Sequence, residues 1–168
     1  MKILGIDPGT ARIGWGIVSS EGDRVESLGY GLIKTHQATS PEKRLEQIFR
    51  QISAIIISEK PDLLAIERLF FCRNALTAMA VSEARGVILL AASQNKTEVA
   101  EYTPMQIKEA VTGYGRADKK QVAEMVKMIL KLKEAPKIDD TADALGVAIC
   151  ASGCHKLKQR IEVNHAKT

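Results

Sequence analysis

The sequence lacks any long apolar run, and its longest apolar stretches are far shorter than the roughly 20 residues that cross a membrane. Met1 is followed directly by residues typical of a strand, so we expect no signal peptide. Internal repeats and low-complexity tracts are absent as well. These absences argue against a membrane protein and favour a globular protein of the cytoplasm.

Cysteine is scarce, and its pattern argues against a disulfide framework and against a zinc site. The three cysteines are an odd number and form no CxxC pair. Cys150 and Cys154 lie one helical turn apart and His155 follows, but two further ligands at a usable spacing for zinc are missing. We interpret these cysteines as small buried thiols, which fits a reducing cytoplasm.

The net charge of +4 is small, but the positive charge is unevenly distributed. Residues 108–133 carry seven Lys or Arg against three acids, and the segment 155–168 carries four against one. Positive charge gathered in one segment is typical of a surface that binds a phosphate backbone. We predict one domain over 1–154 and interpret 155–168 as a basic, frayed tail.

The apolar spacing changes from strand-like to helical along the chain. Three short strands separated by tight turns, Asp-Pro-Gly first among them, predict an antiparallel meander. Alternating helices and strands follow, which adds parallel strands to a mixed sheet. The predicted elements are strands over 2–7, 12–19 and 27–35, a helix from 41, a strand over 63–66, a helix over 74–93, a strand over 97–102 and helices over 103–111, 118–132 and 140–152.

Four acids, Asp7, Glu67, Asp140 and Asp143, stand where these predicted elements begin or end. Asp7 and Glu67 close two strands, and pairing of those strands would bring them together at the carboxyl edge where ligands gather. Asp140 and Asp143 are three residues apart and share one helix face. Such a cluster needs a compensating cation, and oxygen ligands suit Mg²⁺ or Mn²⁺, which in pairs cut phosphodiesters.

Each acid also has a purely structural interpretation. Asp7 is at a position where turns favour Asp, and Glu67 fits a surface charge at a strand end. Asp139 and Asp140 both suit a helix N-cap, and Asp143 would favour the positive end of the helix. We assign Asp139 to capping and Asp140 to the metal site. Because the two acids are adjacent, the assignment could be off by one residue.

The ordered set of motifs resembles the RuvC family of bacterial Holliday junction resolvases. The matching segments are Gly5-Ile6-Asp7-Pro8-Gly9, Gly14-Trp15-Gly16, Ala65-Ile66-Glu67, Phe70 with Asn74-Ala75, Ala84-Arg85-Gly86, Gly113 to Lys119 and Asp140-Thr141-Ala142-Asp143-Ala144-Leu145. They occur in the right order and spacing over about residues 2–152. One such motif is a weak signal, whereas the whole set is specific.

The resemblance implies an RNase H-like fold, a mixed five-stranded sheet flanked by helices. It implies a homodimeric, Mg²⁺-dependent endonuclease that nicks two strands of like polarity in a four-way junction, leaving 5′-phosphate and 3′-hydroxyl ends in recombination and repair. It also implies a branch-migration motor of the RuvA and RuvB type as partner. The family's four metal-binding acids carry over onto Asp7, Glu67, Asp140 and Asp143, its aromatic contact onto Phe70, and its basic contacts onto Lys108 and Lys119.

The residues themselves support the same chemistry. Two cations, Mg²⁺ with Mn²⁺ as a substitute, would activate a water and stabilise the leaving oxygen, with Asp7 bridging both ions. Phe70 could stack on an unpaired base, for roughly 1–3 kcal/mol, or could be a core residue. The lysines at 108, 119 and 120 would neutralise phosphates, or could be ordinary solvated charges.

The quaternary structure and several rival functions stay open. A two-fold dimer would place one site on each of two strands. The Ala- and Leu-rich face of 75–92 could be the dimer interface or could pack on the sheet. The Gly5 to Thr10 segment also resembles a phosphate loop of actin-like ATPases, although those proteins need two lobes. A related nuclease acting on structured RNA and a non-catalytic junction-binding module are the remaining rivals.

Overall fold

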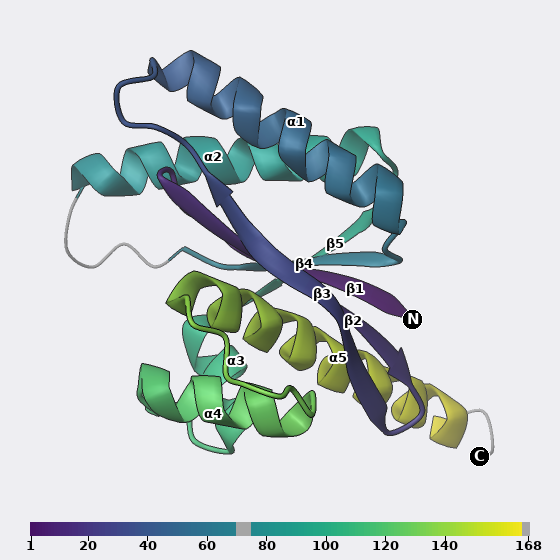
Figure 1. Cartoon of the computed structure of the whole chain (residues 1–168). Coiled ribbons are helices and arrows are strands. Elements are labelled where there is room, and N and C mark those ends of the chain that lie inside the picture. The colour runs from purple at the N-terminus through teal and green to yellow at the C-terminus, as the bar shows by residue number, and fades with distance from the viewer. Residues whose placement is uncertain (70–74, 166–168) are drawn as a thin grey trace.

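The computed structural model describes the backbone of residues 1–69 and 75–165, and the side chains of residues 1–69 and 78–157. Within these ranges the chain forms five strands and five helices, in the predicted order (Figure 1). The elements are β1 (Lys2–Asp7), β2 (Arg12–Glu21), β3 (Arg24–Lys34), α1 (Pro41–Glu59), β4 (Leu63–Glu67), α2 (Ala75–Gln94), β5 (Glu98–Tyr102), α3 (Pro104–Thr112), α4 (Lys119–Ile129) and α5 (Asp139–His165).

The sheet has the order β3-β2-β1-β4-β5, so the first and fourth strands are neighbours, as predicted. β1, β2 and β3 form the antiparallel meander, whereas β4 runs parallel to β1 and β5 runs parallel to β4. Ile6 is paired with Ile66, so the next residues, Asp7 and Glu67, end neighbouring strands at one edge of the sheet. Asp7 is also paired with Gly14, so β2 begins at this same edge.

Helices cover both faces of the sheet, which explains why its central strands are almost continuously apolar. α1 and α2 lie on one side of the sheet, and α5, backed by α3 and α4, lies on the other (Figure 1). Leu4 and Ile6 of β1 belong to the core beneath α1 and α2, and Ile3 belongs to the core beneath α5. The alternation of a strand thus divides its side chains between two cores.

α5 rests directly on the backbone of the sheet because glycines face it. A Cβ atom on Gly5 would overlap the carbonyl oxygen of Ala144, and one on Gly14 would overlap the carbonyl oxygen of Asp140. Only glycine leaves room for so close an approach. The contact brings the first turns of α5, and with them Asp143, to the edge of the sheet where β1 ends.

α5 is longer than the sequence predicts. It continues to His165, whereas the predicted helix ends at Ser152. Ser152 is buried, and its hydroxyl lies 2.8 Å from the hydroxyl of Ser20 on β2, which holds the helix against the hairpin at this point. In the sequence beyond it, Cys154, Leu157 and Ile161 recur at helical spacing, but basic residues lie among them and Gly153 precedes them, a composition that favours a frayed tail. The division into a domain over 1–154 and a tail over 155–168 stays a prediction.

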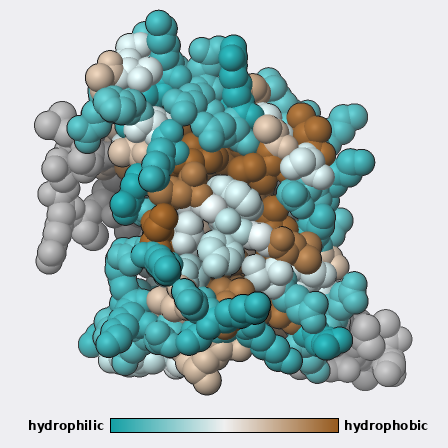
Figure 2. Space-filling view, viewed as in Figure 1, coloured by the Kyte–Doolittle hydropathy of each residue, from teal (hydrophilic) through white to brown (hydrophobic). Residues whose placement is uncertain are grey.

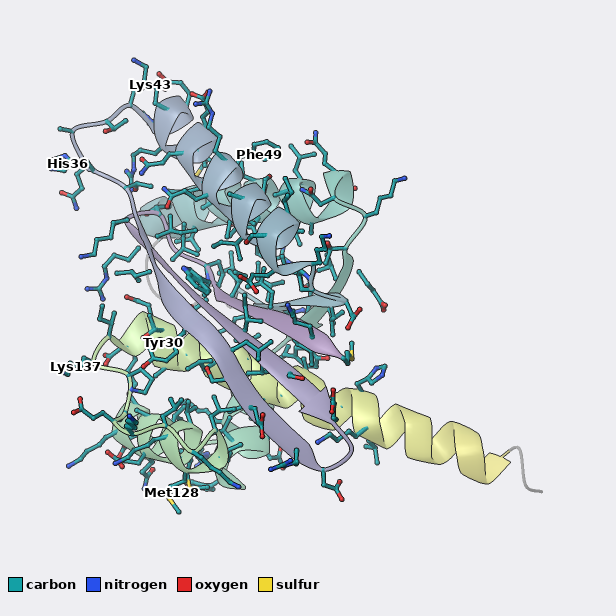
Figure 3. The ribbon with its side chains drawn as sticks, turned by 45° about the vertical axis from the view of Figure 1, so that its right-hand side comes forward. Tyr30, His36, Lys43, Phe49, Met128 and Lys137 are labelled. Carbon is teal, nitrogen blue, oxygen red and sulfur yellow. The ribbon has the colours of Figure 1, made fainter. Side chains whose placement is uncertain are left out.

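The face seen in Figure 2 is hydrophilic over α1 and over α4, with apolar and neutral surface between them along the sheet. On the edge strand β3, Leu28 and Tyr30 have exposed fractions of 51% and 42%. Figure 3 shows Tyr30 on that strand, between Lys43 of α1 and Met128 of α4. None of the helices described here is long and apolar enough to span a membrane.

Candidate metal centre

Three of the four predicted acids meet in one pocket of about 290 Å³, which we call the acid pocket. They come from three separate elements: Asp7 ends β1, Glu67 ends β4 and Asp143 lies in the second turn of α5. The remaining lining residues are Pro104, Ile107 and Lys108 of α3, and Lys119 and Val122 of α4. Two lysines and three carboxylates therefore share a single cleft with apolar walls.

Two helix caps bring the lysines to this pocket. α4 begins after Asp118, whose side chain accepts a hydrogen bond from the backbone N–H of Gln121 at 2.8 Å, while Gln121 Oε1 accepts from the Asp118 N–H at 2.9 Å. This reciprocal capping box fixes the first turn of α4, where Lys119 lies. Thr103 forms the same box with Gln106 at the start of α3, as the Thr-Pro pair predicts.

The acid pocket disfavours negative charge. Burial raises the pKa of Asp7 to about 8, and repulsion from Glu67, Asp143 and Asp140 adds to the shift. Burial raises the pKa of Glu67 to about 7, with repulsion from Asp143 as the next cause. The pKa of Asp143 is raised chiefly by burial as well, although Lys119 opposes the shift. The acids need a cation to ionise together at neutral pH.

Lys119 forms ion pairs with two acids at this pocket. Its ammonium group lies 3.5 Å from Asp143 and 3.7 Å from Asp139. Burial by itself would lower the pKa of Lys119, but attraction to these two carboxylates outweighs it and raises the pKa. Asp139 therefore interacts with the lysine, which sequence reasoning did not predict.

Asp140, the fourth predicted acid, forms an ion pair with Arg12. The guanidinium Nη2 lies 2.8 Å from Asp140 Oδ2, yet this buried oxygen receives no well-aligned hydrogen bond from the described residues. Arg12 is the first residue of β2, at the edge where β1 ends. Asp140 is not among the residues that line the acid pocket.

The start of α5 differs by one residue from the prediction. The carbonyl oxygen of Ile138 accepts the N–H groups of Thr141 and Ala142, so the helix begins at Asp139. Asp139 and Asp140 thus lie inside the first turn, where carboxylates favour the positive end of the helix dipole, and neither is the cap.

The chemistry of the acid pocket fits a divalent cation. Three carboxylates with raised pKa values form a set of hard oxygen donors of the kind that Mg²⁺ and Mn²⁺ bind. Among the described side chains, no three His, Cys, Asp or Glu are already drawn together as a complete ligand set. A bound cation would have to draw these side chains closer and to compete with Lys119 for Asp143.

The other predicted site residues are divided by position. Lys108 and Lys119 line the acid pocket, and Lys120, the next residue of α4, is exposed but outside the set of lining residues. Phe70 lies outside the described residues, so its predicted stacking role stays a prediction.

A second charged cluster, missed by sequence reasoning, supports the chain just after Glu67. The N–H of Arg68 donates to the carbonyl oxygen of Tyr102 at 2.8 Å, and its guanidinium lies 3.5 Å from Glu101. Arg85 of α2 also forms an ion pair with Glu101. Arg12 was likewise missed, although its place could have been found: in an antiparallel hairpin, the start of the second strand lies beside the end of the first.

The raised acid pKa values predict how stability depends on pH. Folded Asp7 takes up its proton at about pH 8, whereas the unfolded value is 3.8, so between these limits the folded state binds more protons. The free energy of unfolding should therefore fall as pH rises from about 4 to 8. In EDTA, Asp7→Asn should be more stable than the unaltered protein at pH 8, on the order of 2 kcal/mol, and nearly equal at pH 4.

Thermal unfolding at both pH values measures this difference. Adding Mg²⁺ at pH 8 should raise the melting temperature of the unaltered protein more than that of Asp7→Asn. Equal stability of the two proteins at pH 8 in EDTA would show that the ionised carboxylate of Asp7 does not destabilise the folded state.

A mixed sheet with acids at the ends of two parallel neighbours, and a further acid from a helix packed on them, defines an RNase H-like nuclease architecture. The family model described as crossover junction endodeoxyribonuclease RuvC matches residues 3–151. A protein of that name from Alkaliphilus metalliredigens is 53% identical over 150 residues, which are 89% of this chain and 92% of that protein.

Solved structures agree with the sequence comparison. The structure of Thermus thermophilus RuvC is similar with a TM-score of 0.85 and 36% identity, over 93% of this chain and 96% of that one. The same protein in complex with a Holliday junction substrate gives a TM-score of 0.85 and 34% identity, with the same coverage. The chain belongs to the RuvC family of crossover junction endodeoxyribonucleases. The predicted family and fold are thereby confirmed.

Proposed function

We propose that this chain is a metal-dependent DNA endonuclease that resolves four-way junctions by symmetric nicks in two strands of like polarity. The observation that carries the proposal is the acid pocket, in which Asp7, Glu67 and Asp143 face two lysines. A relative with 34% identity and the same fold is known in complex with a Holliday junction, which supports the substrate. The family itself supports DNA hydrolysis.

Asp7, Glu67 and Asp143 would hold the metal, with Asp140 completing the set. Two Mg²⁺ or Mn²⁺ ions bound at each site would activate the attacking water and neutralise charge on the leaving oxygen. Asp7 occupies the most buried position of the three and would contact both ions. The apolar walls formed by α3 and α4 limit the access of water to the acids, which strengthens every charge interaction inside.

The two lysines of the pocket would bind the DNA backbone. Lys108 and Lys119 stand beside the acids, where they can neutralise phosphates next to the one that is cut. Lys120 would contact a phosphate farther from the acids. Phe70 would stack on a base near the centre of the junction.

A homodimer is the proposed assembly, because two identical sites related by a two-fold axis suit a junction with similar symmetry. One side of α2 packs on the sheet through Ala84, Ile88, Ala91 and Ala92. Its outward side exposes Met79 and Leu90, and an added Cβ on Gly86 would meet nothing within 4 Å among the described residues. This outward side supports a helix contact between two copies. A motor of the RuvA and RuvB type is the proposed further partner, on the family resemblance.

The deciding experiment incubates the protein with a synthetic mobile four-way junction, with Mg²⁺ or with EDTA, and maps the nicks. We expect paired nicks at symmetric positions, with 5′-phosphate ends, in Mg²⁺ and no nicks in EDTA. A linear duplex of the same sequence and a structured RNA are the matched substrates. Preferential cleavage of the RNA would favour the related RNA nuclease, and tight junction binding without nicks would favour a non-catalytic module.

Lys119→Ala should weaken junction binding and flatten its dependence on salt. Each phosphate contact contributes about 0.9 to the slope of log K against log salt, so the slope should fall by roughly one. Anisotropy titrations in Ca²⁺ at several KCl concentrations measure it, with a gel to show that the junction stays intact. Lys43→Ala removes the same charge from α1, far from α4 (Figure 3), and should leave the slope unchanged. An unchanged slope for Lys119→Ala would show that this lysine does not bind phosphate.

A further inference from the structure

Two basic side chains are paired with the predicted metal ligands. Arg12 lies 2.8 Å from Asp140, and Lys119 lies 3.5 Å from Asp143. Both cations are mainly solvent-exposed, with side-chain exposed fractions of 55% for Arg12 and 68% for Lys119, whereas the two carboxylates are 21% and 27% exposed. The same carboxylates thus serve as counter-ions for basic groups and as candidate ligands for a divalent cation.

We propose that Arg12 is a DNA-binding residue that becomes available when a divalent cation draws Asp140 away from it. In this exchange Asp140 leaves the guanidinium for the metal, and the freed guanidinium binds a phosphate of the DNA. The inference rests on the proposed function, because it assigns a substrate contact to a residue at the edge of the same site.

The geometry favours the exchange. Asp140 Oδ2 is buried and has the guanidinium nearby, but no well-aligned hydrogen bond from the described residues satisfies it. A partly exposed ion pair of this kind contributes little, because water competes for the arginine. A divalent cation shared with Asp7 and Asp143 would offer the same oxygen a much stronger electrostatic partner.

The position of Arg12 suits a phosphate. It begins β2 directly beside the end of β1, so its guanidinium is at the edge of the sheet that carries Asp7 and Glu67. Guanidinium groups bind phosphate in a bidentate manner, with two parallel hydrogen bonds. Lys119 faces the same competition at Asp143, so the two basic groups would be released together.

The exchange couples metal binding to DNA binding. If metal frees Arg12 for a phosphate, DNA must in turn tighten metal binding by the same factor, because coupling between two binding events is reciprocal. Arg12 would then contribute to junction affinity only when metal is present. A plain phosphate contact would contribute equally with and without metal.

The test compares the unaltered protein with its Arg12→Gln variant in two assays. Junction binding is followed by anisotropy against KCl concentration, in EDTA and in Ca²⁺. In EDTA, we expect the two proteins to agree within about twofold in affinity and to share one salt slope. In Ca²⁺, the variant should bind about fivefold to tenfold more weakly, with a slope lower by roughly one.

Arg24→Gln is the matched control, because Arg24 begins β3 at the opposite end of the hairpin and is 80% exposed. It should follow the unaltered protein in both buffers. Circular dichroism and a melting curve for each variant show that the fold is retained.

The second assay measures Mn²⁺ binding without DNA, by titration calorimetry. Arg12→Gln should bind Mn²⁺ severalfold more tightly, because its competitor for Asp140 is gone. An equal loss of junction affinity in EDTA and in Ca²⁺ would overturn the exchange, as would no loss in either buffer, or weaker Mn²⁺ binding. If the unaltered protein fails to bind or cut junctions, the proposed function fails, while the Mn²⁺ titration still tests the competition.

Discussion

Asp7→Asn is expected to lower junction cleavage by at least about a thousandfold, while junction affinity in EDTA stays within a few fold of that of the unaltered protein. Asp7 is repelled by all three of the other predicted acids, since Glu67, Asp143 and Asp140 each raise its pKa. It therefore stands at the centre of the set. An amide at this position has one oxygen, carries no charge and cannot bridge two cations.

Binding should survive because the basic groups that contact phosphate remain. The change also removes a buried carboxylate whose charge is costly, so the variant should fold at least as well as the unaltered protein. Its loss of activity can then be assigned to chemistry and not to unfolding.

Single-turnover nicking of a labelled junction in Mg²⁺, alongside anisotropy binding in EDTA, measures both quantities. Asp23→Asn makes the same chemical change in the hairpin turn between β2 and β3, at the far end of β2 from Arg12, and should cut normally. Nicking by Asp7→Asn within tenfold of the unaltered protein would remove the case for metal ligation by Asp7.

Gly14→Ala is expected to reduce both stability and cleavage, although residue 14 carries no functional group. Its added Cβ would overlap the carbonyl oxygen of Asp140, so α5 must move away from β2. Overpacking of a close contact costs about 1–3 kcal/mol. A shift of about 1 Å in the first turns of α5 would misplace Asp140 and Asp143 and lower the cleavage rate by about a hundredfold.

Melting curves and single-turnover rates, measured well below the melting temperature of the variant, separate the two effects. Gly153→Ala adds the same methyl group to α5 at a position where no described residue lies within 4 Å of it. That control should leave cleavage unchanged and stabilise the helix by up to about 1 kcal/mol. If Gly14→Ala cleaves at the normal rate, the contact between α5 and β2 does not position the acids.

The sequence predicts the parts of the site that depend on local pattern. The strand ends at Asp7 and Glu67 follow from short apolar runs and turn residues, and their proximity follows from pairing two parallel strands. The caps of α3 and α4, and so the position of Lys119, follow from Thr103 and Asp118. These features depend on neighbours in sequence or on the general rules of sheet topology.

The ion pairs could not be predicted in the same way. Arg12 and Asp140 are far apart in the chain, and their contact depends on how closely α5 approaches β2. That approach is set by Gly14, whose importance is visible only once both backbones are placed. The length of α5 was missed for a different reason: the basic charge after Ser152 favours a frayed tail, although Cys154, Leu157 and Ile161 continue the helical spacing in the sequence.

The acid pocket joins the first strand of the chain to its last helix. Asp7 is synthesised early, whereas Asp143 follows only after more than a hundred further residues. α5 can then pack on the glycines of β1 and β2 only after it has been synthesised. During synthesis, all five strands are therefore complete before the full set of carboxylates exists. Competence to cut DNA would then appear late, with the docking of the last helix on the sheet.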